Sequence, residues 1–552
     1  PLVDVAAIDR RLSAVAALAE HTVAREELTL ALSGIADMER LIGRVVYGSA
    51  GGRDLVSLRA SMERIPAVKA QLAAFPSGAL HQLDQQLEDL NDLAALIGQT
   101  LVDEPPFSVR EGEMIRDGFD PEVDRLRGIL HGGKSFLAQM EAEEKEKTGI
   151  RTLKIGYNKV FGYYIEVSNS FRDQVPDHYI RKQTLVNGER YITQELKDLE
   201  HDVLTAKDRD AALEYELFSS LRARLAASVT RVQLAASLIA QLDTLCSFAA
   251  VAVKNNYCRP SVDESGVIEI QGGRHPVVEK MRSDALFVPN DTVMGVKEDR
   301  VSIITGPNMA GKSTYMRQVA LIVLMAQVGS FVPAASARIG IVDGIYTRVG
   351  ASDDLTTGQS TFMVEMSEVA NILKEATEKS LLILDEIGRG TSTYDGMSIA
   401  RAVIEYIADR KKLGAKTLFA THYHELTELE ELIPCVKNYN VAVKKRGEDI
   451  VFLRRIIPGG VDESYGIEVS KLAGIPRWVI DRAYEVLSSL EDGQTVSEAK
   501  VKTRAKPKEE SEQLYFIDEK AEAIKKRLRG ADPNTLTPIE ALNLIYELKK
   551  LL

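Results

Sequence analysis

The sequence predicts a multidomain protein in which helical arms carry a small β-rich module, followed by an α/β domain with parallel strands and a C-terminal helical part. Three observations predict this fold class. Residues 1–149 carry Leu, Ala and Val at helical spacing. Residues 150–193 change to aromatic and β-branched residues bounded by glycines. From about 262 to 458, short apolar runs alternate with helical patterns.

Composition narrows the class of protein. A chain of 552 residues has room for three or four domains. Its net charge of −12 excludes a uniformly basic coat, so contact with nucleic acid would need a local patch. Cys246, Cys258 and Cys435 are odd in number and widely spaced. They argue against a disulfide framework or a zinc site and indicate a reducing, cytoplasmic setting.

The helical arms are the first elements along the chain. Leu80, Leu83, Leu87 and Leu90 fit one face of a helix. After Gly188 no glycine or proline follows for 71 residues, and such a run would reach roughly 90–100 Å if mostly helical. We therefore expect 1–149 to form a helical core and first arm, and 195–260 to form the returning arm and core.

The inserted module, 150–194, would lie at the tip of these arms. It holds seven basic and four acidic residues, a net charge of +3, while the rest of the chain carries −15. Chance charge on a solvated surface explains this balance equally well. Contact with DNA phosphates nevertheless needs only a few such groups.

A phosphate-binding loop follows the apolar run Val301–Thr305. It matches G-x-x-x-x-G-K-[ST] in full. Glycines allow backbone N–H groups to surround a phosphate, Lys312 would contact the β and γ oxygens, and the hydroxyl of Ser313 would bind Mg²⁺. The motif therefore predicts binding of ATP with Mg²⁺. Its residues are Gly306, Pro307, Asn308, Met309, Ala310, Gly311, Lys312 and Ser313.

Polar residues that end two further apolar runs supply candidate catalytic groups. Asp385 ends the run Leu381–Asp385 and is placed to hold the Mg²⁺ water shell. Glu386, the next residue, could polarise the attacking water. His422 follows the run Thr417–Thr421 and would sense the γ-phosphate, although a lone histidine is usually structural.

One uncharged stretch, Gln318–Ala337, is long enough to cross a membrane. Its glutamines, Gly329 and Pro333 interrupt the apolar character, so a buried helix after the phosphate loop is the better interpretation, and no membrane partner is expected. Further on, residues 491–512 are almost without apolar side chains and predict a linker. Thr537 and Pro538 then predict the start of a short amphipathic docking helix.

At this point the motifs resemble those of the MutS proteins of DNA mismatch repair, which belong to the ABC ATPase superfamily. The ATPase motifs are Thr305–Val319, Leu384–Met397 and Ala420–Thr427. Segments similar to other parts of the family are Gly156–Asn169 and Arg190–His201 (clamp and lever), Gly273–Lys280 (the start of the ATPase domain), Ser464–Arg477 (helix-turn-helix dimer element) and Thr537–Lys549 (C-terminal tail). The resemblance extends over essentially the whole chain.

The resemblance implies a domain order and further site residues. Residues 150–194 would be the DNA clamp, 261–459 an ABC-type P-loop ATPase domain, 460–490 the helix-turn-helix dimer element and 513–552 the helical tail after the linker. The implied roles are a signature-loop contact from Ser360 to the partner subunit's ATP, completion of the phosphate cradle by Asn308 and Thr314, stacking of Phe287 on adenine, and contacts of Lys159, Lys182 and Arg190 with DNA. An aromatic packed in a strand core is the alternative for Phe287.

The resemblance also implies partners and an activity. The implied activity is an ATPase that DNA modulates. The implied partners are a second copy of the chain, which forms a homodimer with composite ATP sites, duplex DNA contacted through its backbone, and a MutL-type protein. The family's N-terminal mismatch-reading and connector domains have no counterpart, so mismatch reading is expected in a parent protein rather than in these residues. The alternatives are a MutS relative that acts on recombination intermediates, a transporter ATPase subunit and a chromosome-organising ATPase. The inserted module and the short motif spacing disfavour the last two.

Overall fold

The structure of the chain is a computed structural model. It describes residues 2–109, 111–158, 162–281, 286–307, 310–349, 361–446, 449–460 and 465–491. The chain divides into two compact units, Pro1–Gly474 and Ile475–Leu552. Several predictions fall outside the described residues: Lys159, Asn308, Met309, Ser360, the linker beyond Glu491 and the tail 513–552.

Short helices form the N-terminal region. They are α1 (Val5–Glu20), α2 (Thr22–Leu32), α3 (Met38–Val46), α4 (Gly52–Met62), α5 (Ile65–Leu72), α6 (Gly78–Gln86) and α7 (Asn91–Thr100). The predicted leucine face is wrong in one respect. Leu80, Leu83, Leu87 and Leu90 are all buried in one core, but α6 ends before Leu87 and Leu90 has a left-handed φ of 54°. The chain turns between α6 and α7, so the four leucines share a buried core but not one helix face.

The long arms are α8 (Pro121–Thr148), α9 (Gln194–Ala227) and α10 (Val229–Asn255). Asp120 caps α8 by accepting from the N–H groups of Glu122 and Val123, and the hydroxyl of Thr193 caps α9 at Leu196. The long run without glycine or proline is helical as predicted, with a break at Ser228. The apolar α10 is long enough to cross a membrane by composition, but it packs into the same core as α1 and α3.

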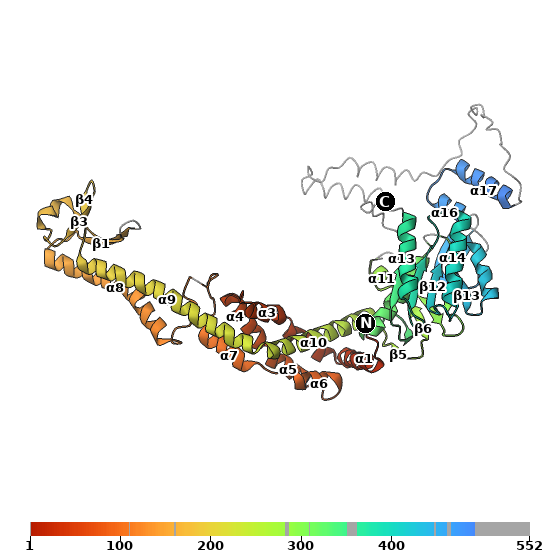
Figure 1. Cartoon of the computed structure of the whole chain (residues 1–552), viewed down its shortest axis with the longest axis horizontal. Helices are drawn as coiled ribbons and strands as arrows, with labels where there is room; N and C mark the ends of the chain where they lie inside the picture. Colours follow the sequence, from red (N-terminus) through yellow and green to blue (C-terminus); the bar gives the residue numbers. More distant parts are fainter. Residues whose placement is uncertain are drawn as a thin grey trace, which may run out of the picture. The chain divides into compact units, whose positions relative to one another are not determined.

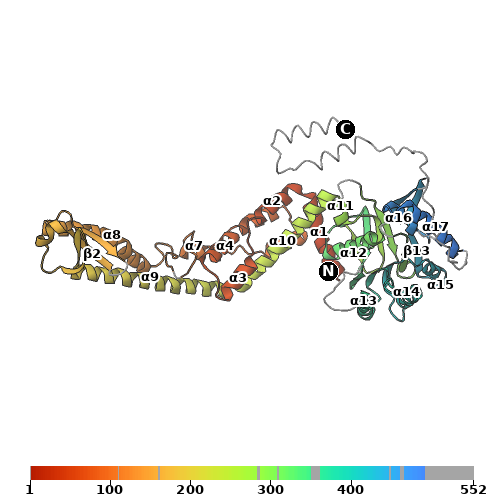
Figure 2. The same ribbon diagram turned by 90° about the horizontal axis from the view of Figure 1, so that it is seen from above.

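The module between α8 and α9 is a four-stranded antiparallel sheet in the order β1-β2-β4-β3. Its elements are β1 (Lys154–Asn158), β2 (Gly162–Ser168), the 3₁₀ turn η1 (Asn169–Gln174), β3 (Ile180–Thr184) and β4 (Gly188–Ile192). A small core of its own includes Ile165, Val167 and Tyr191. Figures 1 and 2 show this sheet at the ends of α8 and α9, as expected for an insertion between arms.

The C-terminal part of the first unit contains a six-stranded sheet in the order β10-β11-β12-β8-β13-β14. The strands are β8 (Val301–Thr305), β10 (Ile345–Arg348), β11 (Leu381–Asp385), β12 (Lys416–Ala420), β13 (Val436–Arg446) and β14 (Asp449–Pro458). Every neighbouring pair is parallel except β13 with β14. Side chains of β8 and β12 are buried throughout, which explains why the predicted strands coincide with the observed ones to within one residue.

A second sheet, in the order β5-β9-β6-β7, packs beside it. The remaining elements are β5 (Ser261–Asp263), β6 (Ile268–Gly273), α11 (Pro276–Met281), β7 (Asn290–Met294), α12 (Lys312–Val328), β9 (Ser336–Gly340), α13 (Thr361–Glu375), α14 (Thr393–Ala408), η2 (His424–Glu428), α15 (Leu429–Leu432), α16 (Gly466–Leu472) and, in the second unit, α17 (Arg477–Glu491). The uncharged stretch that begins at Gln318 thus opens in the buried helix α12, as predicted. Loops after β8, β11 and β12 share one edge of the large sheet, and this edge carries the site.

Candidate functional site

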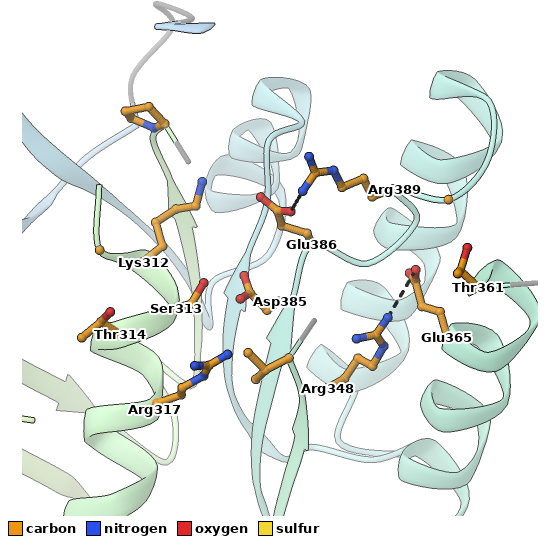
Figure 3. Close-up of a pocket in the computed structure, with 14 residues that line it drawn as sticks. Lys312, Ser313, Thr314, Arg317, Arg348, Thr361, Glu365, Asp385, Glu386 and Arg389 are labelled. Carbon is orange, nitrogen blue, oxygen red and sulfur yellow. Dashed lines mark hydrogen bonds and ion pairs between the residues drawn. The ribbon is translucent and has the colours of Figure 1, made fainter. Parts of the chain in front are cut away.

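A cavity of about 600 Å³ opens at the carboxyl edge of the six-stranded sheet. Figure 3 shows its side chains converging from α12, from the ends of β10 and β11, and from α13. This is the edge at which open α/β sheets bind ligands. The lining residues are Pro307, Gly311, Lys312, Ser313, Thr314, Arg317, Arg348, Val349, Thr361, Glu365, Asp385, Glu386, Arg389 and Gly390.

Lys312 is the first residue of α12 and lies at the base of the cavity. Gly311 precedes it with a φ of 110°, and Gly306 has a φ of 127°, a region that favours glycine. Lys312 is 4% exposed, and its ammonium donates to the carbonyl of Gly306. Burial lowers the pKa of Lys312, while the nearby carboxylates of Glu386 and Asp385 oppose that shift. The loop therefore directs a positive charge and a helix N-terminus into the cavity.

Asp385 and Ser313 meet across the cavity from β11 and α12. Burial raises the pKa of Asp385, and the nearby Ser313 hydroxyl opposes that shift. Its Oδ1 atom is buried and has no hydrogen-bond partner. Two hard oxygen donors, one with a free lone pair, fit Mg²⁺, which usually takes few protein ligands and completes its shell with water and phosphate. Within the described ranges, no group of three or more His, Cys, Asp or Glu side chains could hold a metal alone.

Glu386 lies at the mouth of the cavity in a strained backbone conformation. Its φ is 54°, and its N–H donates to the carbonyl of Ala420 at 2.9 Å, which ties the loop after β11 to β12. The carboxylate pairs with Arg389 at 2.5 Å (Figure 3). Strain of this kind is retained where the surroundings fix a functional geometry.

His422 follows β12 and lies near the same charges, although it does not line the cavity itself. Its ring tilts against Tyr423 with centroids 4.1 Å apart. Burial lowers the pKa of His422. The charge of Arg389 lowers it further, whereas the charge of Glu386 opposes the shift. A neutral imidazole is therefore favoured at pH 7, and it can donate one hydrogen bond and accept another.

Phe287 lines a smaller cavity of about 80 Å³ that shares Gly311 and Thr314 with the phosphate cavity. It precedes β7 and is half-buried, so it is not the strand-core aromatic that was the alternative. The amide of Gln318 faces the same cavity. It is fully buried, and both its Oε1 and Nε2 atoms lack a hydrogen-bond partner. The sequence pattern does not indicate this amide, because Gln318 lies within a mainly apolar helical stretch.

Two further charged residues were also missed. Arg348 ends β10 and Glu365 lies in α13; each is 5% exposed, and their nearest charged atoms are 3.6 Å apart (Figure 3). The N–H of Gly388 donates to Glu365 at 2.7 Å. A glutamate within the apolar run Phe362–Met366 was the available sequence signal. Ser360 lies outside the described residues, but its neighbour Thr361 lines the cavity.

The predicted DNA contacts of the module have different surroundings. Lys182 lies on the edge strand β3, whose residues are exposed throughout. Arg190 lies on β4, pairs with Glu166 at 2.9 Å and stacks on the ring of Tyr164 at 4.1 Å. Its side chain is 18% exposed. The structure thus leaves Lys182 available to solvent and gives Arg190 partners within the module.

Comparison with known proteins covers most of the chain. Residues 118–209 match MutS family domain IV, 302–491 match MutS domain V, and 518–551 match the DNA mismatch repair protein MutS C-terminal region. Proteins named DNA mismatch repair protein MutS are 54% identical in Ruminiclostridium cellulolyticum, 53% in Acetivibrio thermocellus and 54% in Caldicellulosiruptor bescii. Each alignment covers 100% of this chain and 63–64% of the relative.

These matches agree with the geometry. Domain V, the family's ATPase domain, includes the phosphate loop, Asp385, Glu386 and His422, and domain IV includes the β-rich module. The chain spans a little under two thirds of the length of these relatives. On these grounds the chain belongs to the MutS family of DNA mismatch repair proteins.

Proposed function

We propose that this chain is the ATP-driven clamp region of a mismatch repair protein, which hydrolyses ATP to ADP and phosphate and opens or closes around duplex DNA. The unpaired Oδ1 of Asp385 beside the Ser313 hydroxyl carries the proposal, because a buried carboxylate oxygen without a partner is costly unless a ligand completes it. Mismatch reading belongs to the parent protein in this proposal.

Nucleotide binding would depend on the phosphate loop and on residues that line the cavity. Lys312, Thr314 and the first N–H groups of α12 hold the phosphates, with Gly306, Pro307, Asn308, Met309, Ala310 and Gly311 forming the loop around them. Ser313 and Asp385 hold Mg²⁺, which neutralises phosphate charge when bound. Phe287 stacks on adenine in the adjoining cavity.

Hydrolysis would require the loop after β11. Glu386, held by Arg389, orients a water molecule and accepts its proton as the oxygen attacks the γ-phosphorus and the bond to the leaving ADP oxygen breaks. His422 donates to the γ-phosphate as a neutral ring. Ser360 would complete the site of a second copy, so that ATP joins a homodimer and hydrolysis loosens it. Movement at this edge would reach the module through α9 and α10.

The module would hold DNA by its backbone, with Lys182 as the exposed contact and Lys159 and Arg190 as further predicted ones. We assign 1–149 and 195–260 to core and arms, 150–194 to the clamp, 261–459 to the ATPase domain, 460–490 to the dimer element, 491–512 to a linker and 513–552 to the tail. Binding of a MutL-type partner in the cytoplasm follows from the family alone. The relatives' name favours mismatch repair over a role on recombination intermediates.

The test is Mg²⁺-dependent ATP binding and turnover by the wild type and Asp385→Asn. Asn keeps the volume of Asp but not its charge, so we expect the variant to bind ATP equally well with and without Mg²⁺ and to lose most turnover. The wild type should bind more tightly when Mg²⁺ is added. ATP turnover that continues unchanged in EDTA, or in the Asp385→Asn variant, would contradict the proposed metal site.

A further inference from the structure

We propose that Glu365 is a positioning residue for ATP hydrolysis: it holds the Gly388 peptide and thereby links the loop that carries Glu386 to the first turns of α13. The inference rests on the proposed function and deepens it, because it names how the first turns of α13 would control the hydrolytic carboxylate. Glu365 itself touches neither the nucleotide nor the attacking water in this proposal.

Gly388 is held from three sides. Its N–H donates to Glu365 Oε1 at 2.7 Å, and its carbonyl accepts from the Tyr423 hydroxyl at 3.0 Å. Its φ is 89°, and an added Cβ would lie 2.4 Å from the carbonyl oxygen of Gly396. All of these contacts are buried, so water cannot replace a hydrogen bond that is lost.

The held peptide lies within the short loop that presents the reactive side chains. Glu386 is two residues before Gly388 and Arg389 is one residue after it, and these two form an ion pair with each other. Because Glu386 already has a left-handed φ of 54°, the loop has few ways to adjust if the Gly388 peptide rotates. The position of the carboxylate therefore depends on the partners of Gly388.

Each partner of Gly388 belongs to another part of the site. Glu365 lies one turn into α13, whose first residue Thr361 lines the cavity and follows Ser360 directly. Tyr423 follows His422, the predicted γ-phosphate sensor. A displacement of α13 by a nucleotide on the partner subunit would thus reach the loop of Glu386 through the first turn of the helix and the hydrogen bond from Gly388 to Glu365.

The charge of Glu365 is supported separately from its hydrogen bond. Its Oε2 lies 3.6 Å from Arg348, and the same guanidinium lies 2.9 Å from Glu368, a residue of α13 whose side chain is 52% exposed. Arg348 Nη1 is buried without a hydrogen-bond partner. Glu368 therefore pairs with the same arginine as Glu365 from the same helix but makes no hydrogen bond to the described residues of the loop after β11, which makes it a matched control.

A purely structural role predicts a different result. Replacing one member of a buried ion pair destabilises a fold, and the loss then affects nucleotide binding and turnover together. A positioning role predicts a loss of kcat while the affinity for ATP is kept. Displacing a reacting group by about 1 Å can cost on the order of 100-fold in rate.

The experiment compares Glu365→Ala, Glu365→Gln and Glu368→Ala by ATP turnover, by equilibrium ATP binding and by thermal melting. We expect kcat of Glu365→Ala to fall about 10- to 100-fold with its Kd for ATP within about threefold of the wild type. Glu365→Gln, whose amide oxygen still accepts the Gly388 N–H, should recover most of this loss. Glu368→Ala should hydrolyse ATP at the wild-type rate.

A second arm tests whether Glu365 acts through Glu386. In a Glu386→Gln background, Glu365→Ala should produce no further fall in kcat, since residues that act as a unit are not additive. Wild-type turnover in Glu365→Ala, or equal losses in the Ala and Gln variants together with loss of ATP binding, would overturn the inference. Absence of ATP turnover in the wild type would instead overturn the proposed function, so the two failures are distinguishable.

Discussion

The nucleotide cavity and the β-rich module treat their charged groups in opposite ways. At the cavity, Asp385 and Arg348 each keep a buried polar atom without a partner. In the module, Arg190 pairs with Glu166, and the buried Glu189 pairs with Arg172 and Arg181 at 3.5 and 3.3 Å. The cavity keeps buried polar atoms without hydrogen-bond partners, whereas the module pairs these arginines and Glu189 with one another or with Glu166.

The difference shows which signals identify a site. An unpaired buried polar atom costs about 1–3 kcal/mol, so its retention points to a ligand that completes it. A count of basic residues carries less information about DNA binding. Where an arginine pairs with a neighbouring carboxylate, the carboxylate offsets its attraction for a phosphate. The count of seven basic residues in the module therefore overstates the number available to DNA. The exposed Lys182 is a stronger candidate contact than Arg190.

The largest expected effect is that of Glu386→Gln. Gln keeps the shape of the side chain but cannot accept the proton, so ATP turnover should fall about 10²- to 10⁴-fold, the usual contribution of a general base. ATP binding should persist and should hold the chain as a dimer in size-exclusion chromatography. Glu405→Gln, which changes an exposed glutamate of α14, is the control. Equal turnover in Glu386→Gln and wild type would remove Glu386 from this role.

Lys312→Ala should have the next largest effect, and on affinity rather than on turnover at saturation. Loss of one charge-assisted hydrogen bond costs about 1.5–3 kcal/mol, or about 10- to 150-fold in Kd for ATP. Isothermal titration with ATP measures the change. Lys411→Ala removes an exposed lysine of the same domain and should leave Kd unaltered. A Lys312→Ala variant that binds ATP like the wild type would contradict the cavity assignment.

The cavity was the more predictable region because its main residues belong to short motifs that are continuous in the sequence. Strand β8 is buried along its whole length and β11 up to Leu384, and the phosphate loop follows β8, so residue order alone predicted that Lys312, Ser313 and Asp385 lie at one sheet edge. The Glu365–Gly388 contact joins residues 23 apart through tertiary packing, which no spacing rule specifies. The pairing of Arg190 with Glu166 likewise depends on strand register.

A third region tests whether an unpaired buried atom always indicates a ligand. Asp210 of α9 is 5% exposed, and its Oδ1 has no partner. Its neighbour Glu214 is fully buried and accepts from Arg127 and from the N–H groups of residues 113–115. Burial, together with the charge of Glu214, raises the pKa of Asp210 to about 6. Below about pH 6 a proton on Asp210, shared with Glu214, would account for the unpaired atom without a ligand.

This interpretation predicts a pH dependence that Asp210→Asn removes. Because the folded pKa lies above the unfolded one, the stabilisation is complete below about pH 4 and is lost as the pH rises through about 6. Between pH 4 and 7.5 the wild type should lose on the order of 1–3 kcal/mol relative to the variant, since a tenfold change in proton affinity is about 1.4 kcal/mol. Parallel denaturation curves of the two proteins would exclude the shared proton.

A smaller effect is expected in the module. Lys182→Glu should weaken binding to duplex DNA a few-fold and lower the salt slope by about one, whereas Arg190→Gln should leave the slope nearly unchanged because Glu166 already neutralises this arginine. ATP turnover without DNA should be the same in both. Titration of duplex at several salt concentrations measures the slopes. Equal slopes for the two variants would mean that internal pairing does not withdraw an arginine from DNA.

The smallest expected effect is a preference for mismatched DNA. Mismatch discrimination needs an apolar wedge and a step that unstacks readily. Among the described residues of the module, Tyr157 packs edge-on against Tyr163 at 5.0 Å, and Tyr179 and Tyr191 are buried. The ring of Tyr164 lies under Arg190. Each of these rings therefore has a packing partner or is buried, although Tyr157 remains 55% exposed.

Basic groups contact phosphates, which are alike in paired and mispaired DNA, so the ratio of affinities for G·T and matched duplexes should be close to one for this chain. Competition binding at one salt concentration measures it. A preference of tenfold, about 1.4 kcal/mol, would show that these residues contain a mismatch reader. The residue to replace first would then be Val186, which is 93% exposed between β3 and β4, because aliphatic side chains can also wedge a base step. If Val186→Ser abolished such a preference, the module would read bases as well as hold the backbone.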